Sequence, residues 1–217
     1  MQAIEISVNY DFICPWCWIG HLNLEAGIRA ANLPVPVAIQ YVPFELNPTM
    51  PVDGMDRREY RTAKFGSWVR SQVMDAQVAA TGLAAGAKFN YDKVSRTPNT
   101  RLAHQLMQYA LSIGDAQKTE ALYQSIFTAY FSEGRDIGLL ATLVEIAANN
   151  GFDADAAEEY LTRGRGLAKV FEAQRLAQQQ GIRSVPTVFI AGEAISGAQP
   201  PAIFSAALRA ALERSAA

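Results

Sequence analysis

Cysteine and histidine are scarce in this sequence of 217 residues, which contains two of each. A scaffold held together by disulfides needs cysteines spread along the chain, yet Cys14 and Cys17 belong to a single Cys-x-x-Cys motif. Closing so small a ring removes little entropy from the unfolded chain, so a purely structural disulfide explains the pair poorly. Redox chemistry or metal binding is the better interpretation.

The sequence also lacks an excess of basic charge, a long apolar segment and an N-terminal signal sequence. Its formal net charge is −2, whereas nucleic-acid-binding proteins are typically basic. No apolar run approaches the length of a membrane span, and residues 1–5 lack the basic start of a signal peptide. We therefore expect a globular cytoplasmic protein with no nucleic acid and no membrane as its partner.

The cysteine pair lies between a predicted strand and a predicted helix. Apolar and polar residues alternate strictly over residues 4–12, which is the pattern of a half-buried strand. After the cysteines, apolar residues recur at helical spacing until near Asn32. Pro15 suits the first turn of this helix, because the N–H that proline lacks has no partner there. Cys14 then occupies the N-cap, where unpaired backbone N–H groups and the helix dipole favour its thiolate.

The remaining pattern predicts one α/β domain interrupted by helices. A second strand is expected at residues 37–42 and a hairpin at 185–196, followed by a helix that begins near Pro200 and buries Ile203. Between them, Asp115, Asp136 and Asp153 are the expected N-caps of helices at 116–132, 137–149 and 154–162. Further helices are expected at 167–180 and from Thr97, the latter with Ile113 on its buried side, and a loop is expected at 82–90. The core would comprise residues 1–48 and 165–217, and the all-helical insertion residues 49–164.

Zinc binding is an alternative role for the cysteines. His21 lies one turn after Cys17 on the predicted helix, and His104 is the other histidine, so a site with two cysteines and two histidines is arithmetically possible. The usual spacing of a second ligand pair is missing, however. We therefore expect His21 on the helix surface, His104 in the core or an interface with its ring hydrogen-bonded, and no metal site.

Pro186 is the second notable feature, because it opens the apolar strand after residue 184. A proline at such a position is tolerated in any edge strand and is weak evidence by itself. Together with an upstream strand, Cys-x-x-Cys motif and helix, it becomes specific.

The segments Cys14-Pro15-Trp16-Cys17 and Ser184-Val185-Pro186-Thr187 resemble the DsbA family of the thioredoxin superfamily, especially its FrnE-like cytoplasmic branch. Segments at residues 11–20, 99–104, 129–137 and 194–199 resemble that branch as well. The resemblance implies a thioredoxin fold (βαβ…ββα) with a large helical insertion and no cofactor. It also implies a cis bond before Pro186, close to the cysteines.

The same resemblance implies a thiol-disulfide oxidoreductase acting on protein or peptide thiols and disulfides, with glutathione or thioredoxin as redox partner. Cys14 would attack, Cys17 would resolve the mixed disulfide, and Val185 would pair with a bound strand, while Trp16 and Trp18 supply apolar surface. Periplasmic DsbA proteins have histidine at the position of Trp16. Because an indole cannot hold a positive charge, we expect a weaker oxidant than DsbA.

Two other functions remain open on the sequence. The 2-hydroxychromene-2-carboxylate isomerases and kappa-class glutathione transferases resemble this architecture, but they use a serine in place of Cys14 and bind glutathione. Redox activity without glutathione would argue against them. A client-binding, chaperone-like protein would use an apolar groove instead, and its function would survive Cys14→Ser.

Overall fold

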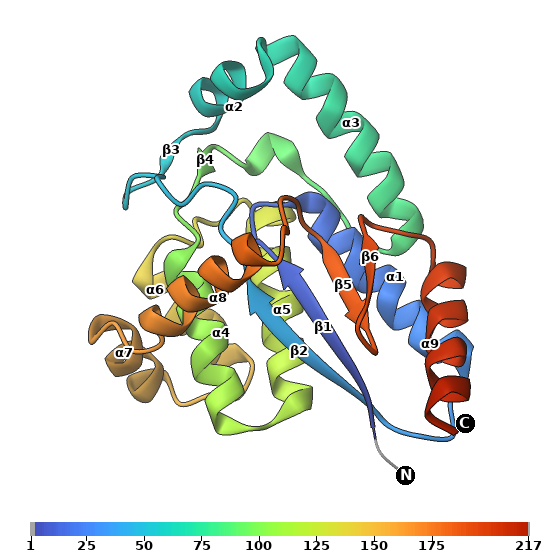
Figure 1. The fold of residues 1–217 in the computed structure, drawn as a ribbon. Helices are drawn as coiled ribbons and strands as arrows, with labels where there is room; N and C mark the ends of the chain where they lie inside the picture. Colours follow the sequence, from blue (N-terminus) through green and yellow to red (C-terminus); the bar gives the residue numbers. More distant parts are fainter. Residues whose placement is uncertain (1–2, 217) are drawn as a thin grey trace.

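The computed structural model describes residues 3–216 and contains a mixed four-stranded sheet in the order β2-β1-β5-β6 (Figure 1). The central strand β1 (Ile4–Tyr10) runs parallel to β2 (Val37–Pro43) and antiparallel to β5 (Thr187–Ile190), which pairs with β6 (Glu193–Ser196). The expected strand–helix–strand unit and hairpin are therefore present. They place the N-terminal and C-terminal parts of the chain in one sheet.

Two helices of the core pack along each other; in Figure 1 one passes behind β5 and the other lies beside it at the right-hand edge. They are α1 (Pro15–Ala31) and α9 (Pro201–Ala216). Gly27 allows their close approach, because a Cβ atom there would lie 2.7 Å from the Cβ of Phe204. Ile203, expected to be buried, is 47% exposed because it lies on the outer side of α9, whereas Phe204 is completely buried.

The segment between β2 and β5 is almost entirely helical, as expected. Its elements are β3 (Met55–Asp56), α2 (Arg57–Phe65), α3 (Trp68–Ala85), the 3₁₀ turn η1 (Tyr91–Lys93), β4 (Arg96–Thr97), α4 (Arg101–Ile113), α5 (Ala116–Phe131), α6 (Leu140–Asn149), α7 (Ala154–Thr162) and α8 (Leu167–Gln179). Helices α2 and α3 form an arm above the sheet, and α8 lies in front of β1 and β2 (Figure 1). No helix within residues 3–216 combines the length and hydropathy that a membrane span requires.

Four details of the insertion differ from the sequence-based expectation. Thr97, where a helix was expected to begin, lies in β4, and that helix begins at Arg101. Helix α3 continues to Ala85 before Gly86 ends it with a φ of 93°, so the first part of the expected loop at 82–90 is helical. Asp136 caps no helix; its carboxylate accepts a hydrogen bond from the N–H of Gly138 ahead of α6. Ile113 is 54% exposed because α4 ends there, beyond the buried part of the helix.

The insertion and the sheet share one aromatic core. The ring of Tyr10, from β1, lies 4.8 Å from that of Tyr123 on α5, and Phe12 lies 5.0 Å from Phe127 on the same helix. All four side chains are fully buried. Helix α5 is therefore fixed against the end of β1, directly beside the start of α1.

Candidate active site

Cys14 occupies the N-cap of α1, as the sequence predicts. Its N–H donates to the carbonyl of Asp11, and its own carbonyl accepts from the N–H of Cys17, both at 3.0 Å. Pro15 fills the first helical position, where no N–H is required. The end of β1 and the start of α1 thereby hold both thiols within one helical turn.

The loop before β5 comes up against Cys14. The peptide bond between Val185 and Pro186 is cis. The Sγ atom of Cys14 lies 3.5 Å from the Val185 carbonyl oxygen, within donating distance for a thiol. Gly20, one turn past Cys17, gives Pro186 its space: a Cβ atom on Gly20 would lie 3.0 Å from Pro186 Cγ. Cys14, Val185 and Pro186 thus meet although they are far apart in sequence.

The two thiols differ in their surroundings. Cys14 retains 5% of its surface and Cys17 none, and both are free cysteines. Burial, followed by a hydrogen bond with Cys14, raises the pKa of the Cys17 thiol well above its ordinary value. Cys17 therefore keeps its proton at neutral pH until a disulfide partner is in place.

The two tryptophans around the motif have different environments. Trp16 is 40% exposed beside the cysteines. Trp18 is only 4% exposed, so the expectation that it supplies contact surface is wrong. Its ring stacks with those of Phe127 and Phe131, and its Nε1–H donates to Gln124 at 3.2 Å.

Both histidines are buried, and neither joins the cysteines. His21, expected at the surface, is 1% exposed because α5 covers this side of α1; its ring centroid lies 4.6 Å from that of Tyr123. His104 is in the core as expected, but its ring makes no hydrogen bond within residues 3–216. Its Nε2 lies 3.4 Å from Asp11 Oδ1. The two histidines and two cysteines form no common ligand group in the described chain.

Asp11 is a residue that the sequence pattern misplaced. In the alternation over residues 4–12 it falls on the polar face, yet its side chain is fully buried. One carboxylate oxygen accepts from the N–H of Leu46 at 2.7 Å, and the other faces His104. A buried acid three residues before Cys14 contributes negative charge beside Cys17.

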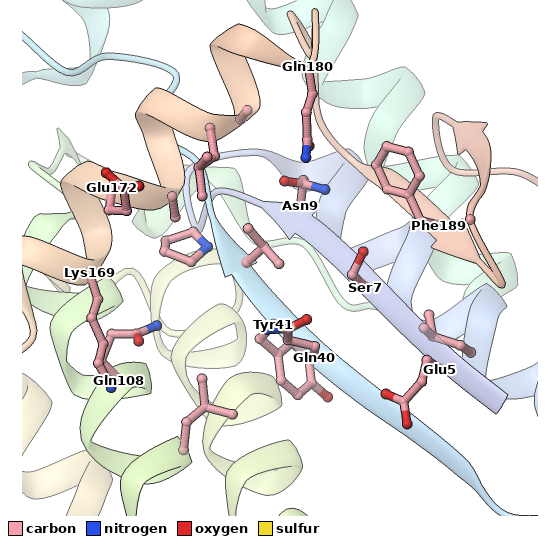
Figure 2. A pocket seen from close by; sticks show the side chains of 18 of the residues that line it. Glu5, Ser7, Asn9, Gln40, Tyr41, Gln108, Lys169, Glu172, Gln180 and Phe189 are labelled. Carbon is pink, nitrogen blue, oxygen red and sulfur yellow. The ribbon is translucent and has the colours of Figure 1, made fainter. Parts of the chain in front are cut away.

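A large groove of about 1070 Å³ lies away from the cysteines, between the sheet and helices α4 and α8. Figure 2 shows Glu5, Ser7 and Asn9 of β1 on its floor, with Lys169 and Glu172 of α8 on its wall. None of its lining residues belongs to the cysteine motif or to the Val185–Pro186 loop. The groove is therefore a separate feature from the thiol site.

The DSBA-like thioredoxin domain, as a sequence family, matches residues 5–209. The chain belongs to this family. A probable DsbA oxidoreductase, SCO1869 from Streptomyces coelicolor, has a similar structure with a TM-score of 0.87 and 27% identity, covering 97% of this chain and 90% of that one. The DsbA resemblance and the thioredoxin fold with a helical insertion are thus confirmed.

Two further solved structures share the fold at lower identity. A 2-hydroxychromene-2-carboxylate isomerase aligns with a TM-score of 0.74 and 16% identity, covering 98% of each chain. The cytosolic disulfide reductase DsbM from Pseudomonas aeruginosa, solved with GSH, aligns with a TM-score of 0.65 and 20% identity, covering 96% of this chain and 99% of that one. At these identities the likeness concerns the fold alone.

Proposed function

We propose that this DsbA-like protein is a thiol-disulfide oxidoreductase that exchanges disulfides with protein or peptide thiols through Cys14 and Cys17. One observation carries the proposal: Cys14 caps α1 beside the Val185 carbonyl, and Cys17 lies one turn deeper in full burial. The outer thiol stands at the helix N-terminus, where a substrate disulfide can reach it, and the inner one is protected from solvent.

The exchange proceeds in two balanced steps. The Cys14 thiolate attacks one sulfur of a substrate disulfide, forming a Cys14–substrate disulfide and releasing the other substrate sulfur as a thiolate. Cys17 then loses its proton and attacks the Cys14 sulfur, which releases the second substrate thiolate and leaves a Cys14–Cys17 disulfide. Two electrons pass to the substrate. The same steps in reverse oxidise a dithiol substrate.

The loop beside Cys14 favours an extended peptide as substrate. The half-buried Val185 precedes β5, and its backbone lies next to the attacking sulfur. A peptide strand can pair with such a backbone without reading its sequence. Trp16, 40% exposed and next to Cys17 in the sequence, offers apolar contact surface. Both features suit unfolded or flexible protein clients.

The redox partner and compartment are part of the proposal. A dithiol enzyme that reduces clients needs a thiol donor, and glutathione or thioredoxin supplies the required two electrons. The DsbM structure with GSH supports glutathione as a candidate. A cytoplasmic setting fits the same comparison with a cytosolic reductase. With Trp16 in place of histidine, we expect a lower reduction potential than that of DsbA.

A glutathione-dependent isomerase is the second candidate, because a 2-hydroxychromene-2-carboxylate isomerase shares the fold. The buried second thiol argues against it. Isomerisation transfers no electrons and requires no resolving cysteine, whereas Cys17 stands one turn from Cys14 with its proton retained. A chaperone-like protein, which binds clients without redox chemistry, would not require Cys14 and Cys17 either.

The test is a mixed-disulfide trap combined with redox equilibrium in glutathione buffers. Cys17→Ala protein, expressed in cells, should migrate on non-reducing gels as adducts with several different proteins, because Cys14 can no longer be released internally. The double variant Cys14→Ser, Cys17→Ala is the matched control and should form none. Adducts with glutathione alone, or no cysteine oxidation across the buffer series, would overturn the proposal in favour of the glutathione-dependent relatives.

A further inference from the structure

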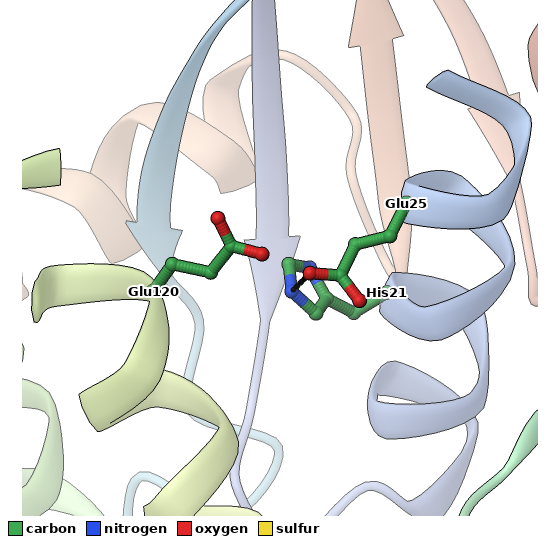
Figure 3. A group of neighbouring side chains, drawn as sticks. All are labelled: His21, Glu25 and Glu120. Atoms are coloured by element: carbon green, nitrogen blue, oxygen red, sulfur yellow. Dashed lines mark ion pairs between the residues drawn. The ribbon is translucent and has the colours of Figure 1, made fainter. Parts of the chain in front are cut away.

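One cluster of ionisable side chains has no part in the thiol chemistry. His21 and Glu25 lie one turn apart on α1, and Glu120 approaches them from α5. Figure 3 shows the His21 ring between the two carboxylates. Their candidate ligand atoms all lie within 4.8 Å of one another, and this is the only such group of three within residues 3–216.

The histidine at the centre of the cluster lacks hydrogen-bond partners. Its side chain is completely buried, and neither ring nitrogen makes a hydrogen bond within the described residues. Nε2 lies 3.7 Å from Glu25 Oε1, too far for a hydrogen bond. In a four-coordinate zinc site with bonds of about 2.1 Å, adjacent ligands are about 3.4 Å apart. The distance of 3.7 Å between Nε2 and Oε1 is therefore closer to the spacing of two ligands on one metal ion than to the length of a hydrogen bond.

The neighbouring tyrosine adds a further unpaired group. The ring of Tyr41 on β2 lies 5.8 Å from that of His21, and its buried hydroxyl has no hydrogen-bond partner in the described structure. A water on a bound ion could accept or donate a hydrogen bond at this hydroxyl.

The charges of the cluster also favour a cation. Glu25 and Glu120 bring two carboxyl groups to the buried His21 ring, and a cation between them would offset their mutual repulsion. Gln124 donates to Glu25 Oε2 at 3.1 Å and orients that carboxylate.

We infer that His21, Glu25 and Glu120 bind one divalent first-row transition-metal ion between α1 and α5. One imidazole and two carboxylates suit zinc or manganese, and three protein ligands leave a position for water. Glu25 is 17% exposed, which gives the ion a route from solvent. The sequence-based expectation of no metal site concerned a site made of two cysteines and two histidines. The site inferred here contains one histidine, two glutamates and no cysteine.

The experiment removes the thiols first, because cysteines themselves bind zinc. Cys14→Ser, Cys17→Ser protein is stripped with a chelator and titrated with Zn²⁺ and, separately, Mn²⁺ in an isothermal calorimeter. We expect one ion per chain with at least micromolar affinity. Glu120→Gln in the same background should weaken binding more than tenfold, whereas Glu158→Gln, which removes an exposed carboxylate on α7, should leave it unchanged.

Two measurements keep the inference open to contradiction if a variant folds poorly. Circular dichroism of each metal-free variant checks the fold, and X-ray absorption of the zinc-loaded Cys14→Ser, Cys17→Ser protein reports the ligands directly. The inference predicts nitrogen and oxygen ligands. Absence of one-to-one binding, an affinity unaltered in Glu120→Gln, or zinc ligation without a histidine nitrogen would overturn it.

Discussion

Helix α1 has two polar sites that are built in different ways. At its N-terminus, Cys14 and Cys17 lie three residues apart in one motif, and the helix end itself supplies the electrostatic environment. One turn further, His21 and Glu25 acquire their third partner, Glu120, only because α5 packs across the helix. The first site depends on the position of residues within an element, and the second on which elements meet. The local sequence pattern therefore predicts the cysteine site but cannot predict the cluster of His21, Glu25 and Glu120.

The largest expected effect separates the two sites by chemistry. Cys14→Ser should lower disulfide-exchange turnover at least about a thousandfold, because a hydroxyl is a far poorer nucleophile than a thiolate. Zinc affinity at the His21 cluster should be unchanged. Insulin reduction and calorimetric titration on the same preparation check both statements. Residual exchange near the wild-type rate would mean that Cys17, or no thiol, performs the chemistry.

The next effect contrasts the two tryptophans that flank Cys17. Trp18→Ala should reduce the free energy of unfolding by about 3–5 kcal/mol, because it opens a cavity against Phe127 and Phe131. Trp16→Ala should stay within about 0.5 kcal/mol of the wild type and act on the KM for peptide substrates instead. Urea denaturation compares the pair. Equal destabilisation by the two substitutions would contradict the buried position of Trp18 and the exposed position of Trp16.

Much of the cysteine site could be predicted from sequence because its determinants are periodic or adjacent. Alternation located β1, and Pro15 after Cys14 located the start of α1. The position of Pro186 came from the resemblance, since no local rule brings residue 186 beside residue 14. The helices of the insertion were predicted from the aspartates expected to begin them and the glycines expected to end them. Asp136 is an exception, because its carboxylate accepts a hydrogen bond within a turn and caps no helix.

The burial of Trp18, His21 and Asp11 could not be predicted, for a common physical reason. Each looks polar or amphipathic on its own element, and each is covered by an element more than 30 residues away in the chain: α5 for Trp18 and His21, and Leu46 with His104 for Asp11. Periodicity describes one face of an element at a time. It says nothing about a second layer that closes over the opposite face.

Gln124 allows a test of the connection between the two regions. It accepts from Trp18 Nε1 at 3.2 Å and donates to Glu25 at 3.1 Å. Gln124→Met keeps the volume but leaves the indole N–H without its partner, which should cost about 1–2 kcal/mol of unfolding free energy. Zinc affinity should fall about tenfold because Glu25 loses its orientation. Peptide disulfide exchange should change little; a large loss would show that the two sites are coupled.

The smallest effect concerns the pH dependence of stability in metal-free protein. The pKa of Glu25 is raised from 4.5 to about 8, so its stabilising contribution is fully present below pH 4.5 and is lost as the pH rises toward 8. The pKa of His21 is lowered from 6.5 to about 4, so its contribution grows with pH up to about 6.5. The two oppose each other up to pH 6.5, and above it only the loss from Glu25 remains.

Urea midpoints of chelator-treated protein should therefore fall between pH 6.5 and 8, and Glu25→Gln should flatten that decline. Glu120 and Gln124 face this carboxyl from α5, Tyr41 lies near it on β2, and Arg29 follows it on α1. All four are retained in the variant, so the difference between the two curves isolates Glu25. Saturating zinc should reverse the slope in the wild type alone, because the ion binds the ionised carboxylates. A slope that Glu25→Gln does not alter would place the shared proton elsewhere in the cluster.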